Sequence, residues 1–390
     1  MKFPSKNTTI LFVFSFFWIS IGLSIVYLGW TPTWTALHIP TMSPIFADMR
    51  TVQGSLYSIE HGYNPQVENP GDPWRRVMNY PLIWVEISKF FHLDNEKNFV
   101  LLVSCYIFAY LVCCFLLLRD FPSIYIILAM FSGSSLLAVE RGNNDLIIFV
   151  LLFAGIYTAQ HYFRDYIKVF TFLLATILKV YPVVAIISFI KKPKPLSFLM
   201  FAITSYFIYI NSELKVIQHG NTANGEISYG LINFLRWISI RIISDETKIA
   251  FVSLMILLSL LLIIAITRNL QLKESKELAY SADLLITGGS IFVITYLIAP
   301  NWDYRLIFLL FCIPYILFIE NDFIKHSTLF CILISMNIVV VRGISPDYVS
   351  VISKHYAFLV IAACLLKELK IIFWSLFSYL PQKNPLALHG

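Results

Sequence analysis

Long uncharged apolar runs alternate with short polar stretches along the whole chain. A helix needs about 20 predominantly apolar residues to cross the hydrocarbon core of a bilayer, and a helix satisfies its own backbone hydrogen bonds there. The shorter runs can tilt or be completed by their polar flanks. The pattern predicts an all-α polytopic membrane protein with about 11–12 transmembrane or re-entrant helices. The runs lie at 10–30, 99–118, 121–139, 146–159, 169–190, 196–210, 249–267, 284–300, 306–319, 327–341 and 349–366.

Composition supports the same class of protein. Hydrophobic residues make up 58% of the chain and charged residues 13%, and the mean hydropathy is +0.74, which excludes a soluble domain of this size. The first run is too long for the core of a signal peptide and has no small-residue cleavage site after it, so we interpret it as a retained signal anchor. We expect residues 1–380 to form one integral membrane domain, followed by a short flexible tail at 381–390.

All six cysteines lie inside apolar runs, and no CxxC pair occurs. Cysteines in this setting are typically small packing residues, so they carry no information about the redox compartment.

Lysine and arginine in short loops predict the orientation, because such loops are retained in the cytoplasm. With a cytoplasmic N-terminus, two much longer loops, 31–98 and 211–248, face the non-cytoplasmic side of the plasma (inner) membrane. The basic residues that then share the cytoplasmic side are Lys2, Lys6, Arg119, Arg164, Lys168, the Lys191-Lys192-Pro193-Lys194 cluster, Arg268, Lys273, Lys276 and Lys325.

This orientation requires that the run 169–190 enters the membrane and returns to the same side. Tyr181-Pro182 supplies the break, since proline removes a helical hydrogen bond. Each arm of about ten residues would measure about 15 Å at 1.5 Å rise per residue, so we expect this hairpin to reach about halfway across.

The two long loops differ from each other, and the halves of the chain show no internal symmetry of the kind that inverted-repeat transporters carry. Within the second loop, Leu231–Ile238 has the pattern of an amphipathic helix at the membrane interface, with a partly buried loop as the alternative.

The first long loop contains a predicted helix. Ser43 is suited to the N-cap and Pro44 to the first helical position. At 100° per residue, Asp48 lies about 60° from the centre of the apolar stripe and Arg50 far around the other side. An acid so near the start of a helix usually stabilises the helix dipole. This structural role is the alternative interpretation of Asp48. The stripe consists of Ile45, Met49, Val52, Leu56 and Ile59.

Three further polar groups are expected at the same membrane face. The segment 140–145 (ERGNND) is denser in charge than a tight turn needs, and Lys179 is the only charge in its apolar run. Placing a lysine at membrane depth costs roughly 2.5–3.5 kcal/mol, so such residues usually line a cavity or meet an anionic ligand; snorkelling to the interface is the alternative. The segment 301–305 (NWDYR) completes the set, with an internal pair between Asp303 and Arg305 as its alternative reading.

The outer face therefore carries one candidate general base, Asp48, and three candidate cations, Lys179, Arg305 and Arg141. A base that deprotonates a hydroxyl, with cations that hold a phosphate leaving group, is the inventory for moving a group from a lipid phosphate onto an alcohol.

An ordered set of short motifs resembles glycosyltransferase family 87, whose members have the C-type glycosyltransferase fold and are similar to polyprenol-phosphate-mannose-dependent mannosyltransferases. The resemblance covers roughly residues 10 to 320. The motifs are Phe46-Ala47-Asp48, Gly62-Tyr63-Asn64-Pro65, Tyr80-Pro81-Leu82, Arg141-Gly142-Asn143-Asn144, Leu178-Lys179-Val180-Tyr181-Pro182 and Asp303-Tyr304-Arg305-Leu306-Ile307-Phe308.

The resemblance implies an inverting transfer of a hexose, with mannose favoured, from a polyprenyl-phosphate sugar to a lipid or glycan hydroxyl. Asp48 matches the family's catalytic aspartate, and substrate-binding positions fall on Asn144, Tyr181, Asp303 and Tyr304. Two departures leave the sugar and the acceptor open: Gly142-Asn143-Asn144 stands where glycine-glutamine-x-asparagine is commoner, and Tyr80-Pro81-Leu82 where two prolines are commoner.

Other chemistries find little support in the sequence. It has no Walker loop, no GxGxxG after a strand, no HExxH and no DxD pair, so we expect no cofactor and no metal site. The net charge of +6 is explained by loops that match anionic headgroups of membrane lipids, and we expect no nucleic-acid partner. Two alternatives stay open: a polysaccharide polymerase or ligase that uses lipid-linked sugars, and a non-enzymatic transporter of lipid-linked sugars.

Overall fold

The computed structural model describes residues 6–162, 165–190, 192–210, 228–242, 248–341 and 347–378. The predicted tail at 381–390 and most of the loop 211–248 lie outside these residues. Helices dominate, and the strands are two residues each: β1 pairs antiparallel with β2, with Ser228 opposite Trp302.

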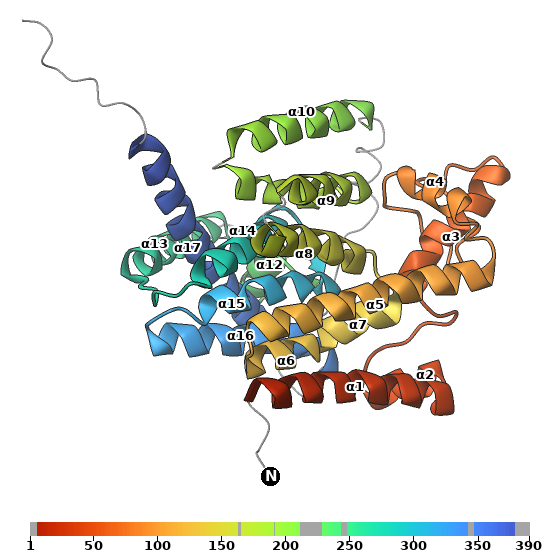
Figure 1. The fold of residues 1–390 in the computed structure, drawn as a ribbon, viewed down its shortest axis with the longest axis horizontal. Helices are drawn as coiled ribbons and strands as arrows, with labels where there is room; N and C mark the ends of the chain where they lie inside the picture. Colours follow the sequence, from red (N-terminus) through yellow and green to blue (C-terminus); the bar gives the residue numbers. More distant parts are fainter. Residues whose placement is uncertain are drawn as a thin grey trace, which may run out of the picture.

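The elements follow one another as a series of helices that run back and forth along the long axis of the molecule (Figure 1). They are α1 (Lys6–Leu28), α2 (Trp30–Ala36), α3 (Ala47–Glu60), α4 (Ile83–Phe90), α5 (Glu96–Asp120), α6 (Ile124–Met130), α7 (Gly133–Arg141), α8 (Asp145–Tyr162), α9 (Asp165–Leu178), the 3-10 helix η1 (Tyr181–Phe189), α10 (Pro193–Tyr209), β1 (Ser228–Tyr229), α12 (Leu231–Ile242), α13 (Lys248–Asn269), α14 (Leu278–Ile298), β2 (Asn301–Trp302), the 3-10 helix η3 (Asp303–Phe311), α15 (Ile313–Ile316), α16 (Asp322–Val341) and α17 (Asp347–Ser378).

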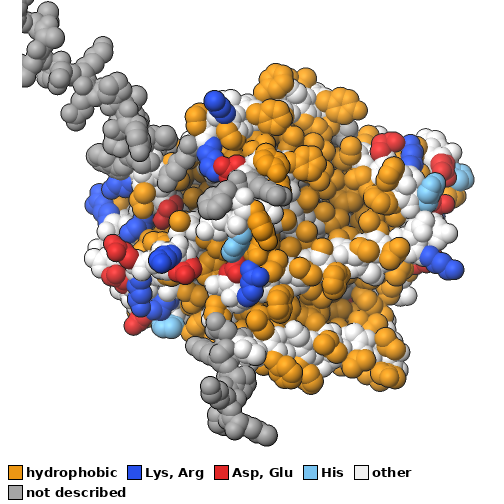
Figure 2. All heavy atoms as spheres, viewed as in Figure 1, with side chains coloured by type: hydrophobic (Ala, Val, Ile, Leu, Met, Phe, Trp, Pro, Cys, Tyr) orange, Lys and Arg blue, Asp and Glu red, His pale blue; other side chains and the backbone are white. Residues whose placement is uncertain are grey.

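Seven helices in the described part of the chain are long and apolar enough to cross a membrane. Figure 2 shows why a bilayer suits them: hydrophobic side chains cover the middle of the visible face, and most charged side chains gather toward the two ends. The chain is thus an all-α protein of the membrane-spanning type. The remaining apolar runs form α9 with η1, α10, η3 with α15, and α16, of which only α16 is a single helix of 20 residues. The seven spans are Thr8–Leu28, Glu96–Asp120, Ile124–Arg141 (α6 followed by α7), Asp145–Tyr162, Val252–Asn269, Leu278–Ile298 and Tyr348–Ile372.

The described basic loops meet at one end of the bundle, which we call the basic end. His161 contacts Asp120 at 3.1 Å, so α5 and α8 end side by side. Tyr125 at the start of α6 contacts His326 at the start of α16 at 2.9 Å. The backbone of Lys273 donates to Phe318, which joins the loop before α14 to the chain before α16. Helices α3 and α4 lie at the opposite end, which we call the α3 end (Figure 1).

The predicted hairpin is present. Helix α9 ends at Leu178, and η1 begins at Tyr181 with Pro182 in its first turn, so the chain breaks where the proline predicts. At the base of the hairpin, Lys192 bonds Asp165 at 2.5 Å, which brings the described part of the lysine cluster back to the basic end.

The expected depth of the hairpin is wrong. Its apex, Lys179, bonds Asp145, the first residue of α8, while its base begins just after α8 ends. The hairpin therefore runs along the whole of α8 instead of half of it. Both arms are longer than the expected 15 Å: α9 has 14 residues, or about 21 Å at 1.5 Å per residue. The arm η1 has nine residues, but a 3-10 helix rises about 2.0 Å per residue, which gives about 18 Å.

The predicted start of α3 is also wrong. Ser43 is not the N-cap; the helix begins at Ala47 after Phe46, whose φ of 61° is left-handed. The extra residues let Phe46 reach a buried position against Trp30 and Phe99, with ring centroids at 4.8 and 6.4 Å. The predicted apolar stripe is confirmed at its centre, where Met49, Val52 and Leu56 are buried, whereas Ile59 is exposed.

The second predicted amphipathic segment is helical, as α12. Its Phe234 is buried and stacks on His355 of α17 at 3.7 Å, so one face of α12 packs on the bundle. At the centre of the bundle, η3 and α15 are almost fully buried from Leu306 to Ile316 and extend from the α3 end toward the basic end. The cysteines are free, and Cys113, Cys114, Cys312 and Cys364 are buried in the packing.

Candidate functional site

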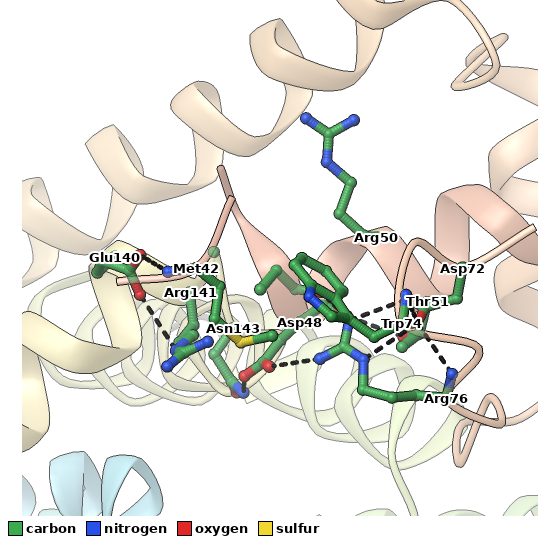
Figure 3. Close-up of polar contacts among 12 residues, drawn as sticks. Met42, Asp48, Arg50, Thr51, Asp72, Trp74, Arg76, Glu140, Arg141 and Asn143 are labelled. Carbon is green, nitrogen blue, oxygen red and sulfur yellow. Dashed lines mark hydrogen bonds and ion pairs between the residues drawn. The ribbon is translucent and has the colours of Figure 1, made fainter. Parts of the chain in front are cut away.

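A cluster of polar side chains lies at the α3 end, centred on Asp48 (Figure 3). One carboxylate oxygen of Asp48 accepts a hydrogen bond from the Asn143 side-chain amide at 2.6 Å, and the other lies 3.6 Å from the Arg76 guanidinium. The Asp48 side chain keeps 16% of its surface exposed. The carboxylate of Asp48 is therefore contacted by Asn143 and Arg76, and the rest of its surface is partly exposed.

Glycine lets α3 approach the loop after α7. Gly142 ends α7 with φ 54°, and a Cβ atom there would lie 2.9 Å from both Phe46 and Val103. Because only glycine leaves this space, Asn143 comes within reach of Asp48. The side-chain oxygen Oδ1 of Asn143 accepts from the Asp145 backbone amide at 2.8 Å, which orients the side-chain nitrogen Nδ2 toward Asp48.

Arg76 is positioned by the loop that follows α3. Its guanidinium bonds the buried Asp72 at 2.9 and 3.2 Å, donates to the Ala47 carbonyl, and lies 4.6 Å from the centre of the Trp74 ring. The loop packs tightly on α3, since a Cβ on Gly54 would lie 2.3 Å from the backbone of Gly71. Sequence reasoning missed Arg76; its only local signal is the i, i+4 spacing from Asp72.

Arg141 and Glu140 form the other side of the cluster. They pair at 3.1 Å, and Glu140 also accepts from the backbone of Met42 at 3.2 Å and from the Trp30 indole at 3.4 Å. Arg141 is thus a paired cation near Asp48, and Glu140 anchors the segment that leads into α3 (Figure 3). Arg50, which the helical projection places far from the stripe, is buried on that other side and bonds Glu96 at 2.6 and 2.7 Å.

Burial raises the pKa of Asp48 above its ordinary value. The hydrogen bond from Asn143 and the positive charges of Arg141, Arg76 and Lys179 act in the opposite direction. Lys179 and Arg141, predicted from separate segments, therefore lie close enough to Asp48 to affect its charge.

Lys179 and Arg305 meet at a second acid, Asp145. The Lys179 ammonium bonds one oxygen of Asp145, and the Arg305 guanidinium lies 3.3 Å from the other. The Tyr181 hydroxyl donates to the same acid at 2.8 Å, and Arg305 also donates to Asn301. Lys179 is consequently paired with an acid, because the hairpin brings it to an aspartate 34 residues away.

The predicted alternative of an Asp303–Arg305 pair is wrong. Asp303 is fully buried and bonds Lys354 of α17 at 2.8 Å, while Arg305 turns to Asp145. Asp303 thus ties η3 to α17. Its neighbour Tyr304 is only partly buried and keeps some exposed surface.

Asn144, predicted to bind substrate, makes no hydrogen bond to Asp48; its neighbour Asn143 does. Asn144 is fully buried, and neither polar atom of its side chain has a hydrogen-bond partner among the described residues. An unsatisfied buried amide costs about 1–3 kcal/mol, so Asn144 retains unused hydrogen-bonding capacity beside the site.

Within the described residues, no group of three or more histidine, cysteine, aspartate or glutamate side chains could hold a metal ion. Comparison of the chain with family models, with curated proteins and with solved structures finds no match. Fold and site together define an all-α membrane protein with a partly buried cluster of acids and cations at one end of its helical bundle.

Proposed function

We propose that the protein is a membrane glycosyltransferase that moves a hexose, with mannose favoured, from a polyprenyl-phosphate sugar to a hydroxyl of a lipid or glycan. The observation that carries the proposal is the Asp48 carboxylate, fixed by Asn143 and Arg76 yet still partly exposed, with Lys179 near enough to affect its pKa. The order of motifs that resembles glycosyltransferase family 87 supports the same activity.

In the proposed reaction, Asp48 accepts the proton of the acceptor hydroxyl as its oxygen attacks the anomeric carbon. The bond between that carbon and the phosphate oxygen of the donor breaks, and the polyprenyl phosphate leaves with the bonding electrons. Attack from the face opposite the leaving group inverts the anomeric configuration. A carboxylate serves as such a base when it is ionised and within hydrogen-bond reach of the hydroxyl.

The charges around the site favour an anionic donor. Arg76 is paired with Asp72 and Arg141 with Glu140, whereas Lys179 and Arg305 share the single carboxylate of Asp145. The Asp145 group thus holds two cations at one acid, and the Asp48 carboxylate is close enough to balance the second positive charge. Two cations that share one carboxylate can also bind an anion from outside, such as the donor phosphate.

The test is transfer from synthetic polyprenyl-phosphate mannose by the purified protein, with radiolabelled sugar and an extract of membrane lipids and glycans as acceptor. The expected result is label in a new glycoside of opposite anomeric configuration. Donor movement across proteoliposomes without a new glycosidic bond would indicate a transporter, and a ladder of products would indicate a polymerase. Retention of configuration would contradict the proposed single displacement.

A further inference from the structure

An apolar groove lies far from Asp48, between α9 and α10 at the basic end. Its volume is about 520 Å³. Apolar side chains of both helices form its walls, and Asp165 and Lys194 lie at its polar end. The residues lining it are Asp165, Tyr166, Val169, Phe170, Leu173, Lys194, Pro195 and Phe198.

The walls of the groove are suited to hydrocarbon. Tyr166, Phe170 and Phe198 expose 68, 64 and 55% of their surfaces, on helices that are apolar over most of their length. From Tyr166 to Leu173 the helix rises about 10 Å, at 1.5 Å per residue, so the groove is deep enough for the upper part of an acyl chain.

The polar end of the groove has a net positive charge. Lys192 and Asp165 neutralise each other at 2.5 Å, and Lys194 is exposed and makes no ion pair within the described residues. The end of the groove therefore has a net positive charge, next to a tyrosine of the kind that marks membrane interfaces. Basic groups at such a position attract anionic lipid headgroups.

Helix α10 buries few of its side chains against the rest of the protein. Of its 17 residues, only Leu199 and Ile203 are buried, and they face α9 and η1. A lipid chain in the groove would contact α9 and α10 together and would add packing where the protein supplies little.

We propose that this groove binds an anionic phospholipid, with the acyl chain along Val169, Phe170 and Leu173 and the headgroup phosphate at Lys194. The bound lipid holds α10 against the hairpin. The inference is independent of the proposed glycosyl transfer, because neither the groove nor its ligand includes a residue of the Asp48 cluster.

Native mass spectrometry of the protein in uncharged detergent tests the proposal, with added dioleoyl phosphatidylglycerol or dioleoyl phosphatidylcholine. The wild type should bind phosphatidylglycerol more tightly. Lys194→Gln should weaken that binding about fivefold, which corresponds to the ~1 kcal/mol of one basic residue near an anionic surface, and should leave phosphatidylcholine binding unchanged. Lys276→Gln is the matched control, since Lys276 is an exposed lysine in a described basic loop outside the groove, and it should bind as the wild type does.

Two further measurements distinguish the contribution of the acyl chain to lipid binding from that of the headgroup. Val169→Trp fills the groove and should weaken binding of both lipids, and glycerol 3-phosphate should fail to displace phosphatidylglycerol. Phosphatidylglycerol should also raise the melting temperature of the wild type more than that of Lys194→Gln, because a ligand of the folded state stabilises it. Equal affinity for the two lipids, equal affinity of Lys194→Gln and wild type for phosphatidylglycerol, or displacement by glycerol 3-phosphate would each overturn the proposal.

Discussion

Two aspartates at the α3 end, Asp48 and Asp145, differ in how completely their carboxylates are used. Asp145 has no exposed surface and is bonded by Lys179, Arg305 and Tyr181. Asp48 has 16% of its side chain exposed, one hydrogen bond from Asn143 and a longer contact with Arg76.

The difference separates a structural acid from a reactive one. A carboxylate that is saturated by two cations and a hydroxyl cannot accept a substrate proton without losing those bonds, and it stabilises the fold by neutralising buried charge. A carboxylate held from two sides, with surface left open, can meet a hydroxyl. Asp145 thus positions the cations of the site, and Asp48 is the acid left for chemistry under the proposed function.

The first way to break this comparison is Asp48→Asn, which keeps the size of the side chain and removes its basicity. We expect turnover to fall by about 10²–10⁴, as is typical when a general base is lost, with stability and donor binding nearly unchanged. Glu60→Gln is the matched control, because Glu60 is an exposed acid on the same helix, and its turnover should be that of wild type. Initial rates at saturating donor measure both; a normal rate for Asp48→Asn would exclude it as the base.

Asp145→Asn should show the opposite behaviour. Removing the carboxylate leaves Lys179 and Arg305 buried without their shared partner, and breaking a buried ion pair in this way costs about 3–5 kcal/mol. Thermal unfolding in detergent should therefore reveal a large loss of stability in Asp145→Asn and a small one in Asp48→Asn. If the two variants unfolded at the same temperature, the division into a structural and a reactive acid would be wrong.

The sequence predicted the parts of this site that local patterns encode. The basic residues of the short loops and Pro182 together predicted the hairpin, and the apolar stripe of α3 predicted that Asp48 borders a buried face. Both predictions rest on patterns that can be read directly along the chain.

The partners of these residues could not be predicted in the same way. The pairing of Lys179 with Asp145 depends on how far the hairpin reaches along α8, and so on the 3-10 geometry of η1, which its apolar composition does not reveal. The choice of Asn143 over Asn144 depends on the left-handed turn at Gly142, which decides which of two adjacent amides faces Asp48. Spacing along the chain holds no information on either.

A third prediction concerns the cations that Asp145 holds. Charge-assisted contacts to phosphate are worth about 1.5–3 kcal/mol each, so Lys179→Ala should weaken use of the donor by roughly ten- to a hundredfold. Lys168→Ala is its matched control: Lys168 is also a buried lysine paired with an aspartate, Asp283 at 2.6 Å, but it lies nearer the basic end. Both variants should lose stability, and only Lys179→Ala should raise the KM for the donor. An equal KM effect in both would show that Lys179 acts only through the fold.

The smallest effect we expect is a change in pH dependence at Asp48. Arg76 is one of the positive charges that lower the pKa of this acid, against the burial that raises it, so Arg76→Gln should raise the pKa further. A general base must be ionised, and a higher pKa keeps it protonated to a higher pH; the acid limb of the pH–rate profile should therefore move to higher pH, while the rate well above the pKa recovers. Arg75→Gln removes a neighbouring exposed arginine that has no ion pair within the described residues, and its profile should coincide with that of wild type. A uniform loss of rate at every pH in Arg76→Gln would show instead that Arg76 only holds the loop after α3 in place, and an unshifted acid limb would mean that the titrating base of the reaction is not Asp48.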